Sequence, residues 1–184
     1  MVLSLDLTKR YSVADYLAWL DDVRREFIDG FIHFMAEPTF EHADICWNIA
    51  SNLKNTIKDK GCNWQVFCSP VDVCLPKNGE TNEDKIFTVV QPDNFVVCDK
   101  SKRRNDKCYG VTDMIVEILS PTIKKKDLII KHQLYEKVVV KEYWVANSKL
   151  KSMTVYFMQE NGEYDESVDY ASDETFPLTY SMDI

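Results

Sequence analysis

The fold is decided by the stretch Asp113-Met-Ile-Val-Glu117-Ile-Leu119-Ser-Pro121. Five of the six residues from Met114 to Leu119 are apolar, which is typical of a strand buried on both faces. The exception is Glu117, whose carboxylate is expensive to bury without a partner, a bound cation or a change of charge. Two interpretations are open: Glu117 reaches solvent at the strand end, or it belongs to a functional site.

A second carboxylate, Asp93, favours the functional interpretation, because it also borders an apolar run. It follows Gln91-Pro92 and precedes Phe95-Val-Val-Cys98. The sequence therefore offers two acidic residues, each beside a segment with the composition of a buried strand, as candidates for one site.

Length and composition indicate one domain of ordinary size. The chain has 184 residues, 45% of them hydrophobic, and its five glycines and six prolines leave no room for a long flexible linker. No segment approaches the roughly eighteen apolar residues of a membrane span, and no signal-peptide pattern begins the chain, so we expect a cytoplasmic protein outside the membrane. The six cysteines show neither a CxxC pair nor zinc spacing, so we expect free thiols.

The charge distribution bears on nucleic-acid binding. A formal net charge of −8 argues against a general, sequence-blind nucleic-acid binder, because such affinity comes from displacing counterions with Lys and Arg. The basic residues are nevertheless clustered in two segments that follow the two acidic strands, and we interpret them either as solvated loops or as a rim that contacts phosphates. The candidates for DNA contact are Lys102, Arg103, Arg104, Lys124 and Lys125.

The N-terminal part predicts a helix followed by a hairpin. Ser12 can cap a helix that runs over about 13–25. Asp29-Gly30 favours the positive backbone angles of a tight turn, so residues 25–35 are expected to form a hairpin. Its core candidates are Phe27 and Phe31.

The rest of the chain alternates helical and strand patterns. A long helix over about 39–60, stopped by Gly61, and a second over about 124–138 have apolar residues at helical spacing. Between the two helices we expect three strands: one over 64–75 that Ser69-Pro70 breaks into 64–68 and 71–75, one over 86–90 and 93–97 with Pro92 as an edge or bend, and 113–119. After the second helix we expect strands over 142–146, 153–158 and 163–168. The tail through Phe176, Leu178 and Tyr180 is expected to finish the core.

Short motifs occur in a particular order along the chain: Pro92-Asp93, Val116-Glu-Ile-Leu-Ser-Pro121, the series Asp127, Lys131 and Tyr135, and Glu142-Tyr-Trp144. Glu26-Phe-Ile-Asp-Gly30 precedes them, followed by Pro38 and His42. In order and spacing this set resembles the Uma-two family of restriction-endonuclease-like proteins, which are abundant in cyanobacteria. The resemblance covers nearly the whole chain.

The resemblance implies an α/β (α+β) fold with the restriction endonuclease-like core of PD-(D/E)XK nucleases, a mixed β-sheet flanked by helices. The predicted order from Thr39 onward, with helix, three strands, helix and strand, agrees with that core. We expect one domain over 1–184. It would comprise an N-terminal helix and hairpin in 1–37, the core in 38–147 and extra strands in 148–184.

The resemblance also implies a metal site. In that fold the two acidic residues lie on neighbouring strands and their carboxylates converge, so Asp93 and Glu117 would hold Mg²⁺ or Mn²⁺, with the carbonyl of Ile118 as a further ligand. Oxygen ligands suit these hard cations. Further site candidates come from the family pattern alone: Glu26, His42 and Tyr135.

The chain departs from the nuclease motif two residues after Glu117, where leucine (Leu119) stands in place of the expected lysine. The resemblance suggests Lys131 as the substitute. Asp127, Lys131 and Tyr135 are four residues apart and form one helical stripe, which allows Lys131 to face the sheet. The alternative is a solvated ion pair between Asp127 and Lys131.

We therefore expect a metal-dependent endonuclease that hydrolyses DNA, with Asp93, Glu117 and Lys131 as catalytic residues. A homodimer would let two sites address two strands. One alternative is a catalytically inactive module that keeps the fold and binds protein partners or a sister subunit. Another is acid/base chemistry on a glycoside. The glycoside alternative lacks an aromatic sugar platform, because Trp19, Trp47 and Trp64 are interpreted as core or boundary residues and Trp144 lies in a strand.

Overall fold

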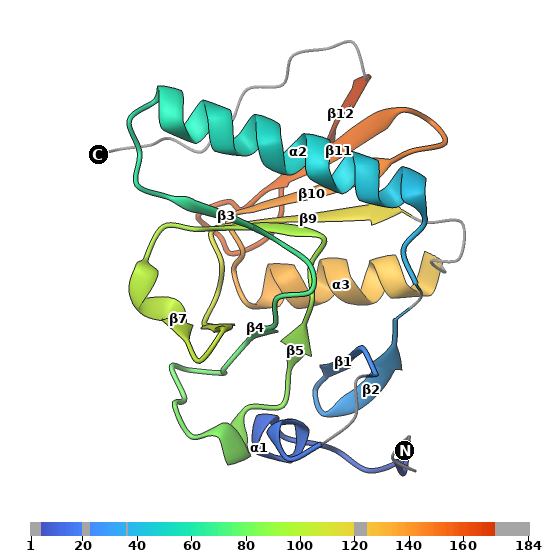
Figure 1. Cartoon of the computed structure of the whole chain (residues 1–184), viewed down its shortest axis with the longest axis vertical. Coiled ribbons are helices and arrows are strands. Elements are labelled where there is room, and N and C mark those ends of the chain that lie inside the picture. The colour runs from blue at the N-terminus through green and yellow to red at the C-terminus, as the bar shows by residue number, and fades with distance from the viewer. Residues whose placement is uncertain (1–4, 20–22, 36, 120–124, 172–184) are drawn as a thin grey trace.

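The computed structural model describes residues 5–19, 23–35, 37–119 and 125–171, with only the backbone of 125–127. Two six-stranded mixed sheets and two long helices make up the described part (Figure 1). The main sheet has the order β12-β11-β10-β9-β6-β3 and the second sheet has the order β2-β1-β5-β4-β8-β7. This arrangement confirms the predicted fold class.

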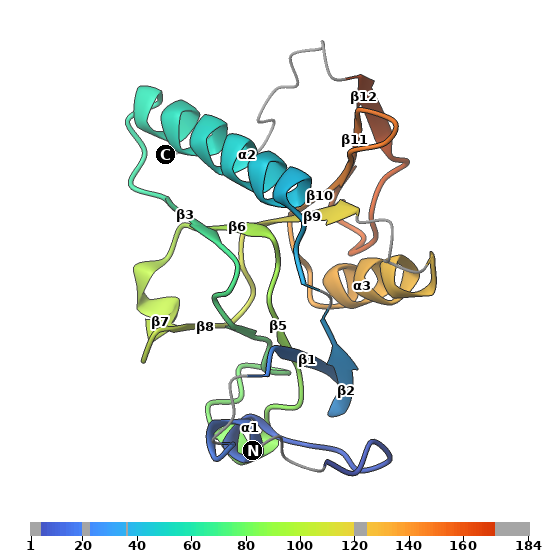
Figure 2. The ribbon, with the colours of Figure 1, turned by 45° about the vertical axis from the view of Figure 1, so that its right-hand side comes forward.

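The main sheet contains the strands β3 (Gln65–Cys68), β6 (Asn94–Val97), β9 (Met114–Leu119), β10 (Glu142–Asn147), β11 (Ser152–Phe157) and β12 (Val168–Ala171). Strand β9 pairs in parallel with β10 and antiparallel with β6. Helix α2 (Phe40–Asp59) covers one face and helix α3 (Lys125–Lys137) lies on the other (Figures 1 and 2).

Side chains on β9 alternate between these two faces, as the period of a strand requires. Met114, Val116 and Ile118 pack in the cluster that also contains Leu53 and Ile57 of α2. Ile115 packs on the other face, in the cluster that contains Leu134 and Tyr135 of α3. Glu117 belongs to this second set, so its carboxylate is directed toward α3. With the residue only 3% exposed, the interpretation that Glu117 reaches solvent is wrong.

The second sheet begins with the predicted hairpin. Strands β1 (Arg25–Ile28) and β2 (Phe31–Phe34) pair antiparallel, and the turn between them has positive φ at Asp29 (51°) and Gly30 (90°). A Cβ atom on Gly30 would lie 2.9 Å from the Cβ of Arg10, so glycine suits this turn for two reasons. The remaining strands are β4 (Val73–Cys74), β5 (Val89–Val90), β7 (Arg103–Arg104) and β8 (Lys107–Tyr109).

Helix α1 is shorter than the sequence predicts. It spans Val13–Leu17 and is capped by Ala18. Ser12 forms the expected N-cap by accepting the N–H of Asp15, and the Asp15 carboxylate accepts the N–H of Ser12 in return. Trp19 then packs edge-on against Tyr11 and Tyr16, and the chain enters β1 at Arg25. The pairing of β1 with two other strands outweighs the helical pattern at its end.

Other boundaries differ for similar reasons. The predicted strands 71–75 and 86–90 shrink to Val73–Cys74 and Val89–Val90 and pair in the second sheet rather than the main one. In the predicted strand 163–168, Tyr164 makes one isolated bridge and regular pairing starts at Val168. Phe176, Leu178 and Tyr180 lie outside the described residues.

Two aromatic residues are more exposed than expected. Phe27 is fully buried, but Phe31 is 45% exposed because β2 is the edge strand of its sheet. Trp47 on α2 is 69% exposed, so it is not a core residue.

Two 3₁₀ turns, η1 (Glu83–Lys85) and η2 (Lys100–Lys102), complete the elements of the described chain. None of its helices is both long and apolar enough to span a bilayer.

Candidate active site

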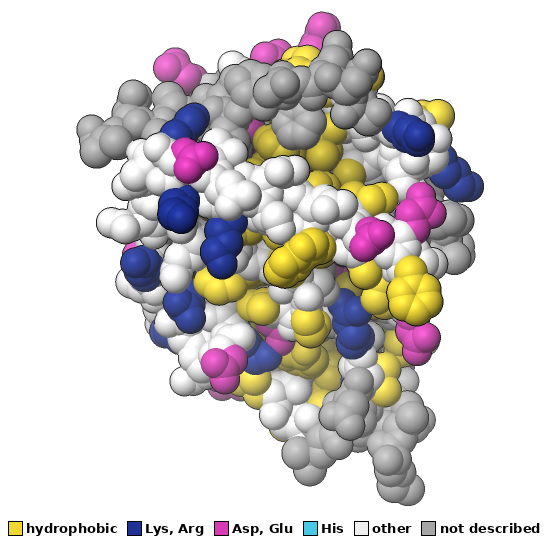
Figure 3. Space-filling model, turned by 45° about the horizontal axis from the view of Figure 1, so that its top comes forward, with side chains coloured by type: hydrophobic (Ala, Val, Ile, Leu, Met, Phe, Trp, Pro, Cys, Tyr) yellow, Lys and Arg dark blue, Asp and Glu magenta, His cyan; other side chains and the backbone are white. Residues whose placement is uncertain are grey.

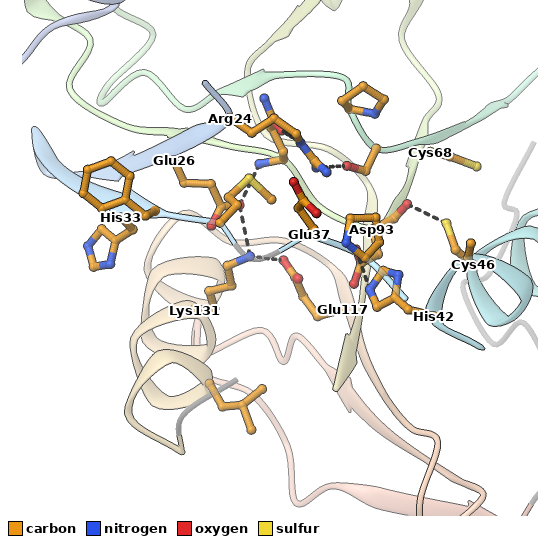
Figure 4. Close-up of a pocket in the computed structure, with 18 of the residues that line it drawn as sticks. Arg24, Glu26, His33, Glu37, His42, Cys46, Cys68, Asp93, Glu117 and Lys131 are labelled. Carbon is orange, nitrogen blue, oxygen red and sulfur yellow. Dashed lines mark hydrogen bonds and ion pairs between the residues drawn. The ribbon is translucent and has the colours of Figure 1, made fainter. Parts of the chain in front are cut away.

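A cavity of about 790 Å³ opens where the two sheets, α2 and α3 approach one another. Its lining comes from the hairpin, the first turns of α2, the segment before β6, the end of β9 and α3 (Figure 4). Polar groups converge there from all these elements: Glu26, His42, Asp93, Glu117 and Lys131.

Lys131 lies between two carboxylates from different sheets. Its Nζ is 2.9 Å from Oε1 of Glu117 on β9 and 3.0 Å from Oε1 of Glu26 on β1. The hydroxyl of Tyr135, one helical turn further along α3, donates to the same Glu117 oxygen at 2.7 Å. The predicted stripe on α3 therefore faces the site at Lys131 and Tyr135, whereas the side chain of Asp127 lies outside the described residues.

Burial determines the proton affinities in this group. It raises the pKa of Glu117 to about 7, with Lys131 opposing the shift and Asp93 and Glu26 adding to it. Burial alone would lower the pKa of Lys131, but Glu117 and Glu26 outweigh it and the pKa is raised. The pKa of Tyr135 is also raised, first by burial and then by Glu117. Lys131 is therefore held as a cation at neutral pH, while Glu117 can exchange its proton there.

Asp93 lies beside Glu117, although it comes from the segment immediately before β6. Its Oδ2 accepts a hydrogen bond from the backbone N–H of Ile118 at 2.7 Å, and its Oδ1 is 3.1 Å from Nε2 of His42. The hydrogen bond to Asp93 raises the pKa of His42 against the opposing effect of burial. Thr39 caps α2 by accepting the N–H of His42, which fixes the start of the helix next to Asp93.

The donor set fits a divalent cation that keeps several waters. Both hydrogen bonds to Glu117 go to Oε1, and Oε2 accepts none from the described residues although the side chain lines the cavity. The Asp93 carboxylate is adjacent, and its oxygens retain lone pairs beside their two contacts. Within the described chain no three acidic, histidine or cysteine side chains form a ready-made metal cluster. Mg²⁺ and Mn²⁺ suit such a site because they take few protein oxygens and fill the remaining positions with water or phosphate.

The first basic segment follows β6 as expected, but it does not line this cavity and so forms no phosphate-contacting rim around it. Asp93 immediately precedes β6, whereas Lys102, Arg103 and Arg104 follow the other end of that strand (Figures 1 and 2). Because β6 and β9 are antiparallel, the loop that joins them is at the opposite end of the pair from Asp93 and Glu117.

These basic side chains are also engaged locally. Lys102 donates to the carbonyl of Val111, Arg103 stacks over Phe67, and Arg104 stacks over Tyr109. Lys124 and the side chain of Lys125 lie outside the described part. On the face in Figure 3, acidic and basic side chains are mixed with exposed hydrophobic ones.

Two polar residues of the site were not predicted from the sequence. Arg24 lines the cavity and donates to Oε1 of Gln91 and to Oγ of Ser69 (Figure 4). Gln91 donates its backbone N–H to Glu26 and its side-chain amide to the buried Asp72. The available signal was the period of two that puts Arg24 and Glu26 on one face of an extended segment.

A mixed sheet between two helices, with three carboxylates and a lysine converging near the end of its internal strand β9, defines a restriction endonuclease-like protein. The model of the Uma2 family, described as "Putative restriction endonuclease", matches residues 13–182. The chain therefore belongs to the Uma2 family, as its motifs predicted.

Two of the proteins that are similar to the chain illustrate the likeness. Its fold is similar to the crystal structure of "a putative nuclease belonging to DUF820" from Anabaena variabilis, with a TM-score of 0.69 and 18% identity over 91% of this chain and 89% of the other. An uncharacterized protein of Synechocystis sp., slr1290, is 22% identical over 158 residues, which is 84% of this chain and 78% of the relative. The nuclease-like fold and the family together support a nuclease.

Proposed function

We propose that the protein is a metal-dependent endonuclease that hydrolyses phosphodiester bonds in DNA. The observation that carries this proposal is the buried group of Glu117, Asp93 and Lys131 at the wall of a cavity, with one oxygen of Glu117 that accepts no hydrogen bond from the described residues. Membership of the Uma2 family supports the same reaction class.

Asp93 and Glu117 would hold Mg²⁺ or Mn²⁺, and the carbonyl of Ile118 is a further candidate ligand. When bound, such a cation polarises the phosphoryl group and supplies a water that is more easily deprotonated. Ile118 N–H and His42 keep the Asp93 carboxylate oriented, and Tyr135 does the same for Glu117. This rigid support is what a site needs to position reacting groups.

Lys131 supplies positive charge at the reacting position in place of the lysine that Leu119 replaces. Glu26 and Glu117 hold its ammonium in the wall of the cavity. From there it can orient the attacking water or stabilise charge that develops on the phosphate. Its raised pKa keeps the charge in place at neutral pH.

Plasmid nicking tests the proposal. Wild-type protein with Mg²⁺ or Mn²⁺ should convert supercoiled DNA to the nicked form, and the isosteric variants Asp93→Asn and Glu117→Gln should each lose at least about two orders of magnitude in rate. Glu142→Gln is the matched control, since Glu142 is a buried carboxylate on the adjacent strand but does not line the cavity. Equal nicking by all four proteins would assign the activity to a contaminant and refute the proposal.

The alternative is an inactive nuclease-fold module, which Leu119 in the motif position favours. Thermal unfolding separates the two, because a ligand that binds only the folded state raises the melting temperature. An active site predicts a rise with millimolar Mn²⁺ that Glu117→Gln abolishes and Glu142→Gln retains. No rise in the wild type would favour the inactive module. Light scattering would test the proposed homodimer in the same preparations.

A further inference from the structure

Arg24 is a cavity residue whose guanidinium makes two hydrogen bonds and keeps further donors available. Its Nε donates to Oε1 of Gln91 at 3.2 Å, and its Nη2 donates to Oγ of Ser69 at 2.6 Å (Figure 4). An arginine carries five N–H donors in a planar fork. These two bonds leave three donors, including both on Nη1, without a hydrogen-bond partner among the described residues.

The orientation of Gln91 fixes that of Arg24. The side-chain amide nitrogen of Gln91 donates to Oδ1 of Asp72 at 2.7 Å, so its oxygen is left to face Arg24. The backbone N–H of Gln91 donates to Oε1 of Glu26 at 2.8 Å, in the same carboxylate that accepts from Lys131. Ser69 is tied in turn to Asp93, because its N–H donates to the Asp93 carbonyl at 3.0 Å. The guanidinium is thus braced against the two segments that carry the site.

The charges in the cavity distinguish Arg24 from Lys131. Lys131 is paired with two carboxylates, but Arg24 has no carboxylate within 4.0 Å among the described residues. Glu37 also lines the cavity, so acidic side chains outnumber Arg24 and Lys131 there. An anion that enters this cavity therefore meets, in Arg24, a cation whose charge no carboxylate of the described residues contacts.

We propose that Arg24 binds a backbone phosphate of the polynucleotide substrate next to the phosphate held at the carboxylate group. This inference rests on the proposed nuclease function and adds a second phosphate contact to it. The free edge of a braced guanidinium suits a phosphate, because parallel N–H donors can contact two of its oxygens. Arg24 binds substrate in this proposal and takes no part in bond breaking.

Binding of a short labelled DNA duplex, measured by fluorescence anisotropy with Ca²⁺ over a series of salt concentrations, tests the contact. Arg24→Gln should weaken binding about 10- to 100-fold, the range for a lost charge-assisted hydrogen bond. It should also reduce the slope of log affinity against log salt by about 0.9, the value for one phosphate contact. A brace with no phosphate contact would leave that slope unchanged.

Arg10→Gln is the matched control. Arg10 also donates its Nε to the chain, at 2.7 Å from the Asp29 carbonyl, and packs over Phe87, but it does not line the cavity. It removes the same charge, so its salt slope should equal that of the wild type. Equal slopes for Arg24→Gln and the wild type would overturn the proposal, as would an equal fall in both variants.

A measurement on the wild type covers the case in which Arg24→Gln does not fold. Titration with inorganic phosphate in the presence of Ca²⁺ should shift the side-chain Nε–H resonance of Arg24 in NMR spectra and leave that of Arg10 in place. No shift at Arg24 would overturn the proposal.

Failure of the nuclease function itself looks different. It would appear as no nicking and no metal-dependent stabilisation in the wild type. Failure of the Arg24 contact alone would appear as normal nicking with an unchanged KM in Arg24→Gln.

Discussion

Removing the ammonium of Lys131 should expose how the site depends on a single shared cation. In Lys131→Met a side chain of similar length replaces the lysine, so packing is largely kept while the charge is lost. The Glu26 and Glu117 side chains, only 7% and 5% exposed, then share the site without a cation between them. Taking one partner from a buried ion pair typically costs about 3–5 kcal/mol, so we expect a loss in that range at about pH 8.

The loss of stability in Lys131→Met should be smaller at acidic pH, and the pKa of Glu117 explains the direction of this change. The pKa of this carboxyl in the folded protein is already raised from 4.5 to about 7, chiefly by burial, and removal of Lys131 raises it further. Between the unfolded and folded pKa values the native state binds more protons, so stability falls as pH rises. The variant continues to lose stability above the pH at which the wild type levels off. At about pH 5 both forms hold Glu117 neutral, and their stabilities should approach each other.

Urea unfolding followed by tryptophan fluorescence at about pH 5 and about pH 8 measures these differences. Adding Glu117→Gln to the Lys131→Met variant should recover on the order of 1–3 kcal/mol at the higher pH. The control is Lys77→Met, which breaks the exposed pair with Asp29 and should cost about 0–1 kcal/mol. If Lys131→Met lowered the free energy of unfolding as little as Lys77→Met does, or by the same amount at both pH values, Lys131 would not be a buried cation shared by Glu26 and Glu117.

Three further outcomes are expected. Burial raises the pKa of Glu142 from 4.5 to about 7, so stability associated with its neutral form is lost as pH rises through that range, and Glu142→Gln should be more stable than wild type at about pH 8 by at most on the order of 3 kcal/mol. Equal urea midpoints there would contradict this. Since a cation binds deprotonated Glu117, the melting-temperature rise with Mn²⁺ should be larger above about pH 7 than below it; a rise independent of pH would exclude Glu117 as ligand. Tyr135→Phe removes one hydrogen bond to Glu117 and should cost about 1 kcal/mol in urea unfolding, and an unchanged stability would show that the bond is not made in solution.

The elements near the site could be predicted because their local and tertiary signals agree. In β9 the apolar run matches burial on both faces, and the capped helix α2 begins at Thr39 and ends before Gly61 as predicted. Where the signals conflict, sequence patterns fail. The sequence pattern of 71–75 and 86–90 predicts ordinary strands. Which sheet they join depends on pairing with the hairpin, which is distant in sequence, and a local pattern does not show such pairing.

The same limit applies to the site. Family motifs identified Asp93, Glu117 and Lys131, and the structure places them together, but their partners depend on contacts between remote segments. Glu26 meets Lys131 across 105 positions of chain, and no spacing rule connects them. The basic segment at Lys102, Arg103 and Arg104 is close to Asp93 in sequence, but strand β6 lies between them and puts them at its opposite ends. Nearness in sequence therefore did not predict nearness in space.

Lys131 has a mechanical consequence because its two carboxylates belong to different sheets. The N-terminal hairpin is fastened to the main sheet through the same ammonium that neutralises Glu117. If the hairpin moved away from the main sheet, Lys131 would have to leave either Glu26 or Glu117. In the second case Glu117 would lose the positive charge that compensates its own. Separation of the hairpin from the main sheet would therefore also disrupt the charge balance of the candidate active site.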